Sequence, residues 1–293
     1  MNTETTPSVV DRATYQAELD ALRVREKTHT HEGDAIAAAR RRLPMVEVDP
    51  AITLVGPHGP VPLLDVFEGR SQLIAYFHMW HAGHPAAEQC EGCTFFNGQV
   101  RELSYLHSRD VTYATLCQGP YDVSVRYRDF MGWDVPWYSA QDAADALLGD
   151  RPRSPAPLVC YLRQDDRVFE TFWTSGRGLE PMAPTYGLLD MTAYGRQETW
   201  EDSPSGWPQH WEPGTREIMR TDGRPTAQWS RWNPDAPTTS APPGADATDH
   251  SADAATCSRR VSTSAAPSVI AMVCSLCEVR DPSAERMVHP SGS

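Results

Sequence analysis

The chain has 293 residues, 40% of them hydrophobic, which suffices for a buried core and excludes fibrous, collagenous and wholly disordered proteins. Its 26 Lys and Arg residues are outnumbered by 39 Asp and Glu residues, and the formal net charge of -13 argues against nucleic acid or an anionic membrane as a partner. No apolar run approaches the roughly 18 residues of a membrane span, and the polar N-terminus lacks the apolar core of a signal peptide. We therefore expect a cytoplasmic protein with no membrane partner.

Residues 1–45 are predicted to form a helical extension. Asp11 is a suitable N-cap, and apolar side chains then recur on one helical face, at Tyr15, Leu19 and Leu22. A second helix is expected from about Gly33 to Leu43, because Pro44 cannot continue it. We expect both helices to pack onto the core domain that follows.

Strands and helices alternate over this core domain, residues 46–175. Short strands are expected first, at 46–48, 52–55 and 61–64. The near-continuous apolar run 73–77 suits a strand covered on both faces. A helix should follow Cys93, and the later pattern predicts strands and helices at 111–116, 123–131, 135–138 and 143–148, then a hairpin of 158–162 and 168–173. This order predicts an α/β sandwich with a mixed central sheet.

Residues 176–233 are loop-like but rich in aromatic side chains. We predict that this segment docks its rings on the core, and the alternative is a lid over a pocket. Residues 234–293 are dominated by Ala, Pro, Ser, Thr and Asp, which cannot bury enough apolar surface to offset the entropy of ordering. The sequence therefore predicts a disordered C-terminal tail.

The chain contains seven cysteines, an odd number without an export signal, so a structural disulfide framework is not expected. Cys117 and Cys160 lie in predicted strands and are interpreted as small buried hydrophobes. In the tail, Cys274 and Cys277 could relay electrons, form half of a zinc ribbon or have no role. We favour the last interpretation.

Cys90 and Cys93 stand between the strand at 73–77 and an amphipathic helix. At a helix N-terminus the unpaired N–H groups and the helix dipole stabilise a thiolate. Cys90 is therefore predicted to be the catalytic nucleophile, and Cys93, one turn further on, the resolving thiol. The adjacent Glu91 carboxylate opposes the thiolate, but we expect it to turn into solvent, where its charge is screened.

Three histidines precede this motif: His78, His81 and His84. Imidazoles and thiolates are good ligands for zinc or iron, so an alternative metal site would consist of His78, His81, Cys90 and Cys93. The spacing matches no common zinc-finger pattern, and His81 could instead support the Cys90 thiolate electrostatically. The sequence carries no dinucleotide, Walker, serine-hydrolase or c-type haem motif, and we expect no cofactor.

Residues of several elements together resemble a known family. They are Ile52-Thr53-Leu54, Leu63-Leu64, Leu73 to Trp80, Cys90-Glu91-Gly92-Cys93, Arg109-Asp110-Val111-Thr112, Met131-Gly132-Trp133, Pro136-Trp137, Gly176-Arg177-Gly178, Thr185-Tyr186, Leu189-Asp190 and Gly195-Arg196. From about residue 10 to residue 210 the chain looks like the bacterial thioredoxin-like family catalogued as a domain of unknown function and labelled predicted dithiol-disulfide oxidoreductase. The resemblance implies a thioredoxin fold of the peroxiredoxin and thiol-reductase type, and it implies no substrate.

The sequence departs from better-known relatives of that fold at two points. The segment 81–89 separates the strand from Cys90, whereas ordinary thioredoxins place the cysteine pair almost directly after the strand. The peroxiredoxin pattern Pro-x-x-x-Thr-x-x-Cys is not matched, since Gln89 and Gly92 stand at the Thr and Cys positions after Pro85. Disulfide exchange is therefore favoured over peroxidase activity.

Thioredoxins also carry a cis-proline before the strand that faces the cysteines. Pro157 is the best candidate here, and Pro155 is a nearby alternative. We predict a thiol-disulfide oxidoreductase acting on protein or small-molecule disulfides, with an unidentified thiol as its reductant. The alternative is a non-enzymatic metal- or ligand-binding protein of the same fold, and a third interpretation is a scaffold whose cysteine pair is inactive.

Overall fold

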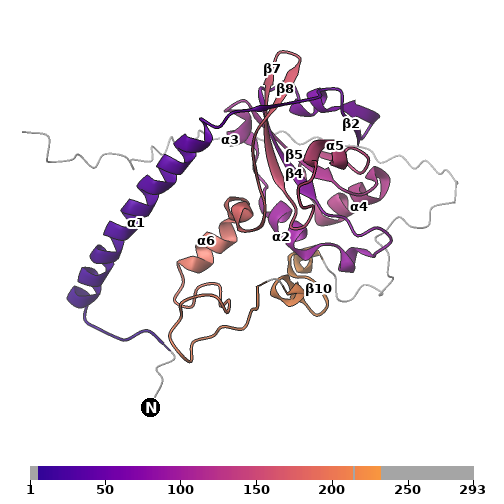
Figure 1. Cartoon of the computed structure of the whole chain (residues 1–293). Helices are drawn as coiled ribbons and strands as arrows, with labels where there is room; N and C mark the ends of the chain where they lie inside the picture. Colours follow the sequence, from indigo (N-terminus) through magenta and orange to yellow (C-terminus); the bar gives the residue numbers. More distant parts are fainter. Residues whose placement is uncertain (1–5, 214, 232–293) are drawn as a thin grey trace, which may run out of the picture. The chain divides into compact units, whose positions relative to one another are not determined.

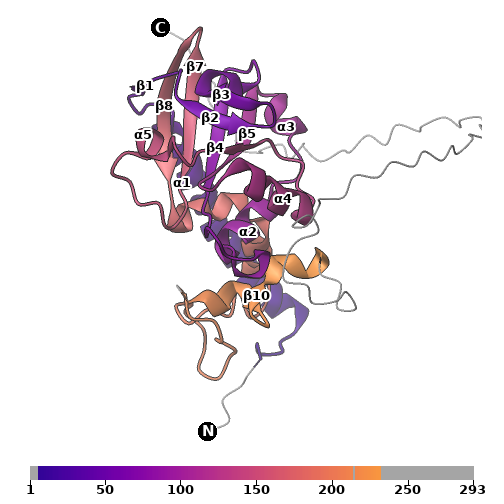
Figure 2. The same cartoon turned by 90° about the vertical axis from the view of Figure 1, so that its right-hand side faces the viewer.

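The computed structural model describes residues 6–213 and 215–231, and Figures 1 and 2 show it from two sides. Its α-helices are α1 (Arg12–Arg40), α2 (Glu91–Gln99), α3 (Ser104–His107), α4 (Tyr121–Met131), α5 (Ala144–Leu148) and α6 (Pro184–Asp190). The short 3-10 helices are η1 (Leu63–Phe67), η2 (Ala86–Glu88), η3 (Gly176–Met182), η4 (Arg216–Met219) and η5 (Thr226–Arg231). The strands are β1 (Val46–Val48), β2 (Thr53–Gly56), β3 (Gly59–Pro62), β4 (Gln72–His78), β5 (Val111–Cys117), β6 (Trp137–Ser139), β7 (Leu158–Gln164), β8 (Arg167–Thr174), β9 (Arg220–Thr221) and β10 (Arg224–Pro225). Within these described ranges, no helix combines the length and apolarity needed to cross a membrane.

The main sheet is mixed and has the strand order β1-β8-β7-β4-β5-β6-β2-β3. At its centre β4 pairs in parallel with β5 and antiparallel with β7. β7 and β8 form the predicted hairpin, with Asp165 in the left-handed region (φ 56) at the turn. The four strands β8-β7-β4-β5, with α2 in the crossover from β4 to β5, make a thioredoxin-like α/β sandwich with a mixed central sheet, as the sequence predicts.

Both faces of this sheet are buried, because successive side chains of β4 and β5 point to opposite sides. Leu73, Ala75 and Phe77 enter one core cluster, to which η1 and α5 contribute their apolar side chains. Tyr76 and Tyr113 enter the other cluster, together with side chains of α2 and α4. Burial on both faces explains why β4 is apolar almost throughout.

Helix α1 differs from the prediction in its length and its packing. It runs unbroken for 29 residues, because Gly33, where a second helix was expected to begin, costs only about 1 kcal/mol in a helix interior. Its N-cap is confirmed, since the Asp11 carboxylate accepts the Thr14 N–H at 2.9 Å. None of its residues is buried, so the expected packing of an apolar face onto the core is wrong. Its last turn approaches β8, where the Arg40 guanidinium lies 5.1 Å from the ring centroid of Phe172.

The segment after β8 lies beside α2. Its elements η4, β10 and η5 all contact that helix, and Figures 1 and 2 both show the orange 215–231 part next to it. Tyr186 of α6 packs on the rings of Phe95 and Phe96 of α2, with centroids 5.1 Å and 6.2 Å away. The predicted tail at 234–293, with Cys257, Cys274 and Cys277, lies outside the described residues.

Candidate active site

Cys90 is the N-cap of α2. Its backbone is not helical (φ -56, ψ 113), while its carbonyl accepts the Thr94 N–H at 3.0 Å. Its Sγ accepts the N–H of Cys93 at 3.3 Å. Although the segment 81–89 separates β4 from α2, Cys90 therefore occupies the helix-start position that stabilises a thiolate.

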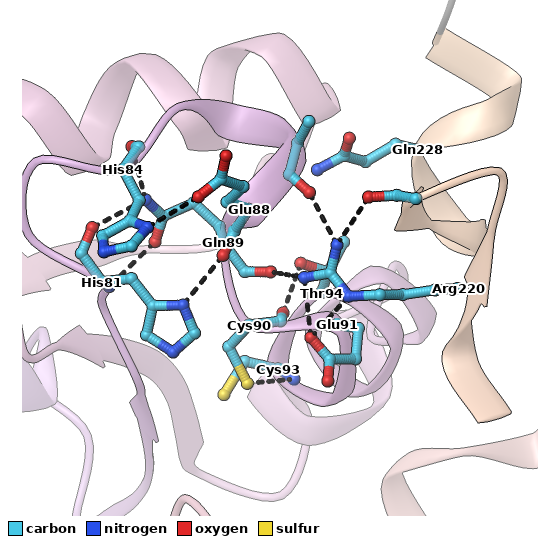
Figure 3. A network of polar contacts seen from close by, with 12 residues as sticks. His81, His84, Glu88, Gln89, Cys90, Glu91, Cys93, Thr94, Arg220 and Gln228 are labelled. Carbon is cyan, nitrogen blue, oxygen red and sulfur yellow. Dashed lines mark hydrogen bonds and ion pairs between the residues drawn. The ribbon is translucent and has the colours of Figure 1, made fainter. Parts of the chain in front are cut away.

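The Gln89 side chain forms hydrogen bonds with the backbone of this inserted segment. This fully buried side chain donates from Nε2 to the carbonyls of His81 (3.0 Å) and His84 (2.9 Å), and its Oε1 accepts the His81 N–H at 3.0 Å. Figure 3 shows the two imidazoles beside Glu88, whose carbonyl lies 2.8 Å from Nδ1 of His81 and whose carboxylate lies 2.8 Å from Nδ1 of His84. These hydrogen bonds close the inserted segment into a turn, which places Cys90 at the N-terminus of α2.

Cys93 lies one turn into α2 and is buried, with 2% of its surface exposed. Its Sγ accepts the Met79 N–H at 3.3 Å, and Figure 3 shows the two cysteine sulfur atoms side by side. Both cysteines are free thiols. This placement keeps Cys93 away from solvent while leaving it next to Cys90.

The two thiols differ in acidity. A hydrogen bond from the Cys93 side chain, helped by the first amides of α2, lowers the pKa of Cys90 although burial and the Glu91 carboxylate oppose it. Burial, followed by the contacts with Cys90, raises the pKa of Cys93 well above its ordinary value. Cys90 is therefore the thiol that ionises first.

Arg220 reaches this site from β9, more than a hundred positions along the chain. Its guanidinium donates to the Glu91 carboxylate at 2.8 and 3.1 Å, and to the carbonyls of Ala87 (2.8 Å) and Gln89 (2.9 Å). The ion pair is largely buried, with 8% of the Arg220 side chain and 17% of the Glu91 side chain exposed. The expectation that Glu91 turns into solvent is therefore wrong, because a cation from the C-terminal segment holds it (Figure 3).

The cis-proline of the site is Pro155, not Pro157. The Ser154–Pro155 bond is cis, and Ser154, Pro155 and Ala156 line the cavity that also contains both cysteines. Pro157 lies directly before β7, and its carbonyl accepts the Phe77 N–H of β4 at 2.9 Å where the two strands begin to pair. The prediction of Pro157 failed because two prolines lie within three residues and the sequence does not show which of the two X–Pro peptide bonds is cis.

A cavity of about 790 Å³ lies against Cys90. Its walls come from β4, the inserted segment, α2, the Pro155 loop, η3, α6, the segment 196–200, and the residues Pro213, Thr215, Ile218 and Met219. Apolar side chains dominate the surface near the thiols, among them Met79, Phe96, Leu179 and Met219. A volume of this size is ordinary for a small-molecule site.

His78 does not join this site. It is fully buried among aromatic rings, with the centroids of Trp137 and Trp133 at 5.3 and 6.0 Å, and neither ring nitrogen has a hydrogen-bond partner within the described residues. Burial lowers the pKa of His78 to about 4. In the described chain, no group of three or more His, Cys, Asp and Glu side chains is placed to hold a metal ion. The four-residue ligand set of the metal alternative is thus not assembled. His81 lines the cavity, and its supporting role towards Cys90 stays a prediction.

The two remaining described cysteines differ from each other. Cys117 is fully buried, as predicted, and burial raises its pKa to about 12. Cys160 is half-buried rather than buried, and its pKa is raised to about 11 by the same cause. Both are poor nucleophiles near neutral pH.

Comparison with known proteins gives a family match and structural similarities. The family described as "Bacterial protein of unknown function (DUF899)" matches residues 4–213. No curated protein matches the chain. Peroxidoxin BcpB from Mycobacterium tuberculosis is similar at 16% identity and TM-score 0.33, over 48% of this chain and 93% of that one. A putative thiol:disulfide interchange protein DsbE from Chlorobium tepidum is similar at 13% identity and TM-score 0.33, over 48% and 95% of the two chains.

Proposed function

Since the chain belongs to the DUF899 family of bacterial proteins, whose function is unknown, we propose from the geometry of its own site that it is a thiol-disulfide oxidoreductase with Cys90 as nucleophile and Cys93 as resolving thiol. Its substrates would be disulfides, and a low-molecular-weight or protein thiol would restore the reduced form.

The observation that carries this proposal is the inequality of the two thiols at the start of α2. Cys90 is half-buried, borders a cavity and has a lowered pKa. Cys93 is buried behind it with a raised pKa. One accessible thiolate with a protected partner one helical turn away is what an exchange reaction through a mixed disulfide needs.

The reaction that follows from this arrangement has two steps. The Cys90 thiolate attacks one sulfur of the substrate disulfide, forms a mixed disulfide and expels the other substrate sulfur as a thiolate, which takes up a proton. Loss of the thiolate at Cys90 removes the negative charge beside Cys93, so Cys93 then ionises more readily. Its thiolate attacks the Cys90 sulfur, closes the Cys90–Cys93 disulfide and releases the second substrate thiol. The substrate gains two electrons, which the reductant later returns to the cysteine pair.

The metal-binding alternative receives less support from the same residues. His78 is enclosed by aromatic rings, and Nδ1 of His81 lies against the Glu88 carbonyl. The His81 contact is compatible with metal ligation through its Nε2 atom. A zinc or iron site built from both histidines and the cysteine pair would, however, require the His78 ring to leave its enclosed position.

Cysteine mapping tests the proposed reaction. After mild oxidation of the full chain, Cys90 and Cys93 should be protected from alkylation and joined to each other in the peptide map. After treatment with dithiothreitol both should be labelled. A Cys93→Ser variant should accumulate mixed disulfides at Cys90, while the matched Cys117→Ser variant, which alters a buried thiol outside the site, should not. Pairing of Cys90 with a different cysteine, or its failure to oxidise, would disprove the mechanism.

A further inference from the structure

The C-terminal stretch 215–231 covers the first turn of α2, beside the cysteine pair, and is fixed in place at separate points. Arg220 forms the buried ion pair with Glu91. Gln228 of η5, which is fully buried, donates to the Ala86 carbonyl at 2.8 Å and to the Tyr127 hydroxyl at 2.7 Å. The Sδ atom of Met219 lies 3.8 Å from the point where a Cβ on Gly92 would stand. These contacts place the stretch directly on the first turn of α2.

Since the stretch 215–231 covers the first turn of α2, a substrate that reaches Cys90 would have to occupy the cavity. Met219 and Ile218 on the covering stretch line it together with Phe96 of α2 and Leu179 of η3. A disulfide on a folded protein would have to displace these side chains to bring its sulfur atoms to Cys90. A small disulfide fits within the existing volume of about 790 Å³.

The charged residues on the cavity wall already have partners within the protein. Arg196 donates to the carboxylates of Asp190 at 2.7 Å and of Glu180 at 3.0 and 3.1 Å. Glu180 also accepts from Arg177 at 2.7 Å. Glu91 is held by Arg220, and the Glu198 carboxylate accepts the indole N–H of Trp200. A charged substrate would lose hydration on entry, and the charged groups that it would meet on the cavity wall already interact within the protein.

We propose that the cavity binds a low-molecular-weight, uncharged disulfide with apolar substituents, and that the covering stretch excludes disulfides on folded proteins. This proposal rests on the proposed function and specifies its substrate class. One substituent of the substrate lies among the apolar side chains of the cavity, and the substrate sulfur atoms lie next to the Cys90 sulfur. The exchange then yields two apolar thiols and the Cys90–Cys93 disulfide, with two electrons passing from the cysteine pair to the substrate.

A pair of nearly isosteric probes isolates the apolar contribution. Dipropyl disulfide and bis(2-hydroxyethyl) disulfide differ by a methyl group in place of a hydroxyl at each end. The fully reduced chain is mixed with an excess of either one, quenched with acid and alkylated, and closure of the Cys90–Cys93 disulfide is followed by peptide mapping. Each rate is divided by the rate of the same disulfide with free dithiothreitol. We expect the normalised rate for dipropyl disulfide to be about tenfold higher or more.

Two further disulfides and one wall variant complete the experiment. Bis(2-carboxyethyl) disulfide, which is doubly charged, and insulin, a protein disulfide, should both give normalised rates at least about tenfold below that of dipropyl disulfide. Ile218→Asn should slow dipropyl disulfide several-fold and leave bis(2-hydroxyethyl) disulfide unchanged. The matched Ile36→Asn variant alters an exposed isoleucine on α1 and should change neither rate.

The outcomes separate the two proposals. Equal normalised rates for the two isosteric probes, a rapid reaction with insulin, or an equal loss for both probes in Ile218→Asn would overturn the substrate assignment and leave thiol-disulfide exchange standing. If none of the disulfides closes the Cys90–Cys93 bond, the proposed function itself is wrong.

Discussion

The acidity of Cys90 depends on two opposite charges that neutralise each other beside it. The Glu91 carboxylate raises the pKa of Cys90, and Arg220 holds that carboxylate in an ion pair. Glu91→Gln should therefore lower the pKa of Cys90 further, because the guanidinium is left without its counter-ion. Arg220→Gln should raise it, because the carboxylate is left without its cation.

The pH dependence of iodoacetamide labelling at Cys90 measures both shifts. In a Cys93→Ser background, where the serine hydroxyl can still donate to the sulfur, the midpoint should lie below the value of about 8.5 of a free cysteine. Glu88→Gln is the control, since this neighbouring carboxylate is half exposed and its charge is screened. A midpoint at or above about 8.5, or shifts of the same sign in both variants, would refute this account.

His78 links stability to pH through its burial. Its pKa is lowered from 6.5 to about 4 in the folded protein, so the unfolded chain binds the additional proton between these two values. Stability is therefore lost as the pH falls from 6.5 towards 4. Between pH 7 and 4.5 this one group should reduce the free energy of unfolding by about 2 kcal/mol.

Urea unfolding at both pH values tests the role of His78. His78→Leu keeps a similar volume among the rings but has no titrating group, so its stability should fall by about 2 kcal/mol less than that of the unsubstituted chain over the same pH interval. His84→Leu, at an exposed imidazole, is the matched control and should retain the full loss. If His78→Leu loses as much stability as the unsubstituted chain, the buried imidazole is not the cause.

At the scale of the elements, the conformation of the inserted turn 81–89 depends on the buried side-chain amide of Gln89. Gln89→Ala would leave the carbonyls of His81 and His84 and the His81 N–H without this partner. Its free energy of unfolding should fall by about 2–3 kcal/mol, which chemical denaturation measures. Glu88→Ala removes the exposed contact with Nδ1 of His84 and should cost less than about 1 kcal/mol. Similar losses in the two variants would mean that Gln89 does not hold the turn.

The sequence predicted the elements whose patterns are local. The apolar run of β4, the β7–β8 hairpin and the start of α2 at the cysteine pair each follow from side-chain periodicity or turn residues within a few positions. The Arg220–Glu91 pair and the choice between Pro155 and Pro157 depend instead on how distant segments meet. A lone arginine in a loop-like stretch belongs to no local sequence pattern. Side-chain periodicity therefore cannot show that it pairs with a carboxylate more than a hundred residues away.

At the scale of the whole molecule, we expect the two parts of the chain on either side of Arg231 to differ in their importance for the site. Residues 215–231 carry Arg220 and Gln228, whose contacts anchor the cover of the site. The composition beyond Trp232 predicts a tail with few buried contacts. A chain ending at Arg231 should therefore keep its Tm within about a degree or two and its rate of Cys90–Cys93 disulfide closure.

A chain ending at Pro213 is the informative counterpart, because it removes the cover as well as the tail. Loss of Arg220 removes the cation that holds the Glu91 carboxylate next to Cys90, which should lower the Tm by about 5 °C or more and raise the pKa of Cys90. Calorimetry and iodoacetamide labelling across pH distinguish the two truncations. Unchanged stability in the shorter chain would show that the stretch 215–231 does not anchor the site. A chain ending at Arg231 that stays folded but no longer turns over with a thiol reductant would instead assign Cys274 and Cys277 an electron-relay role.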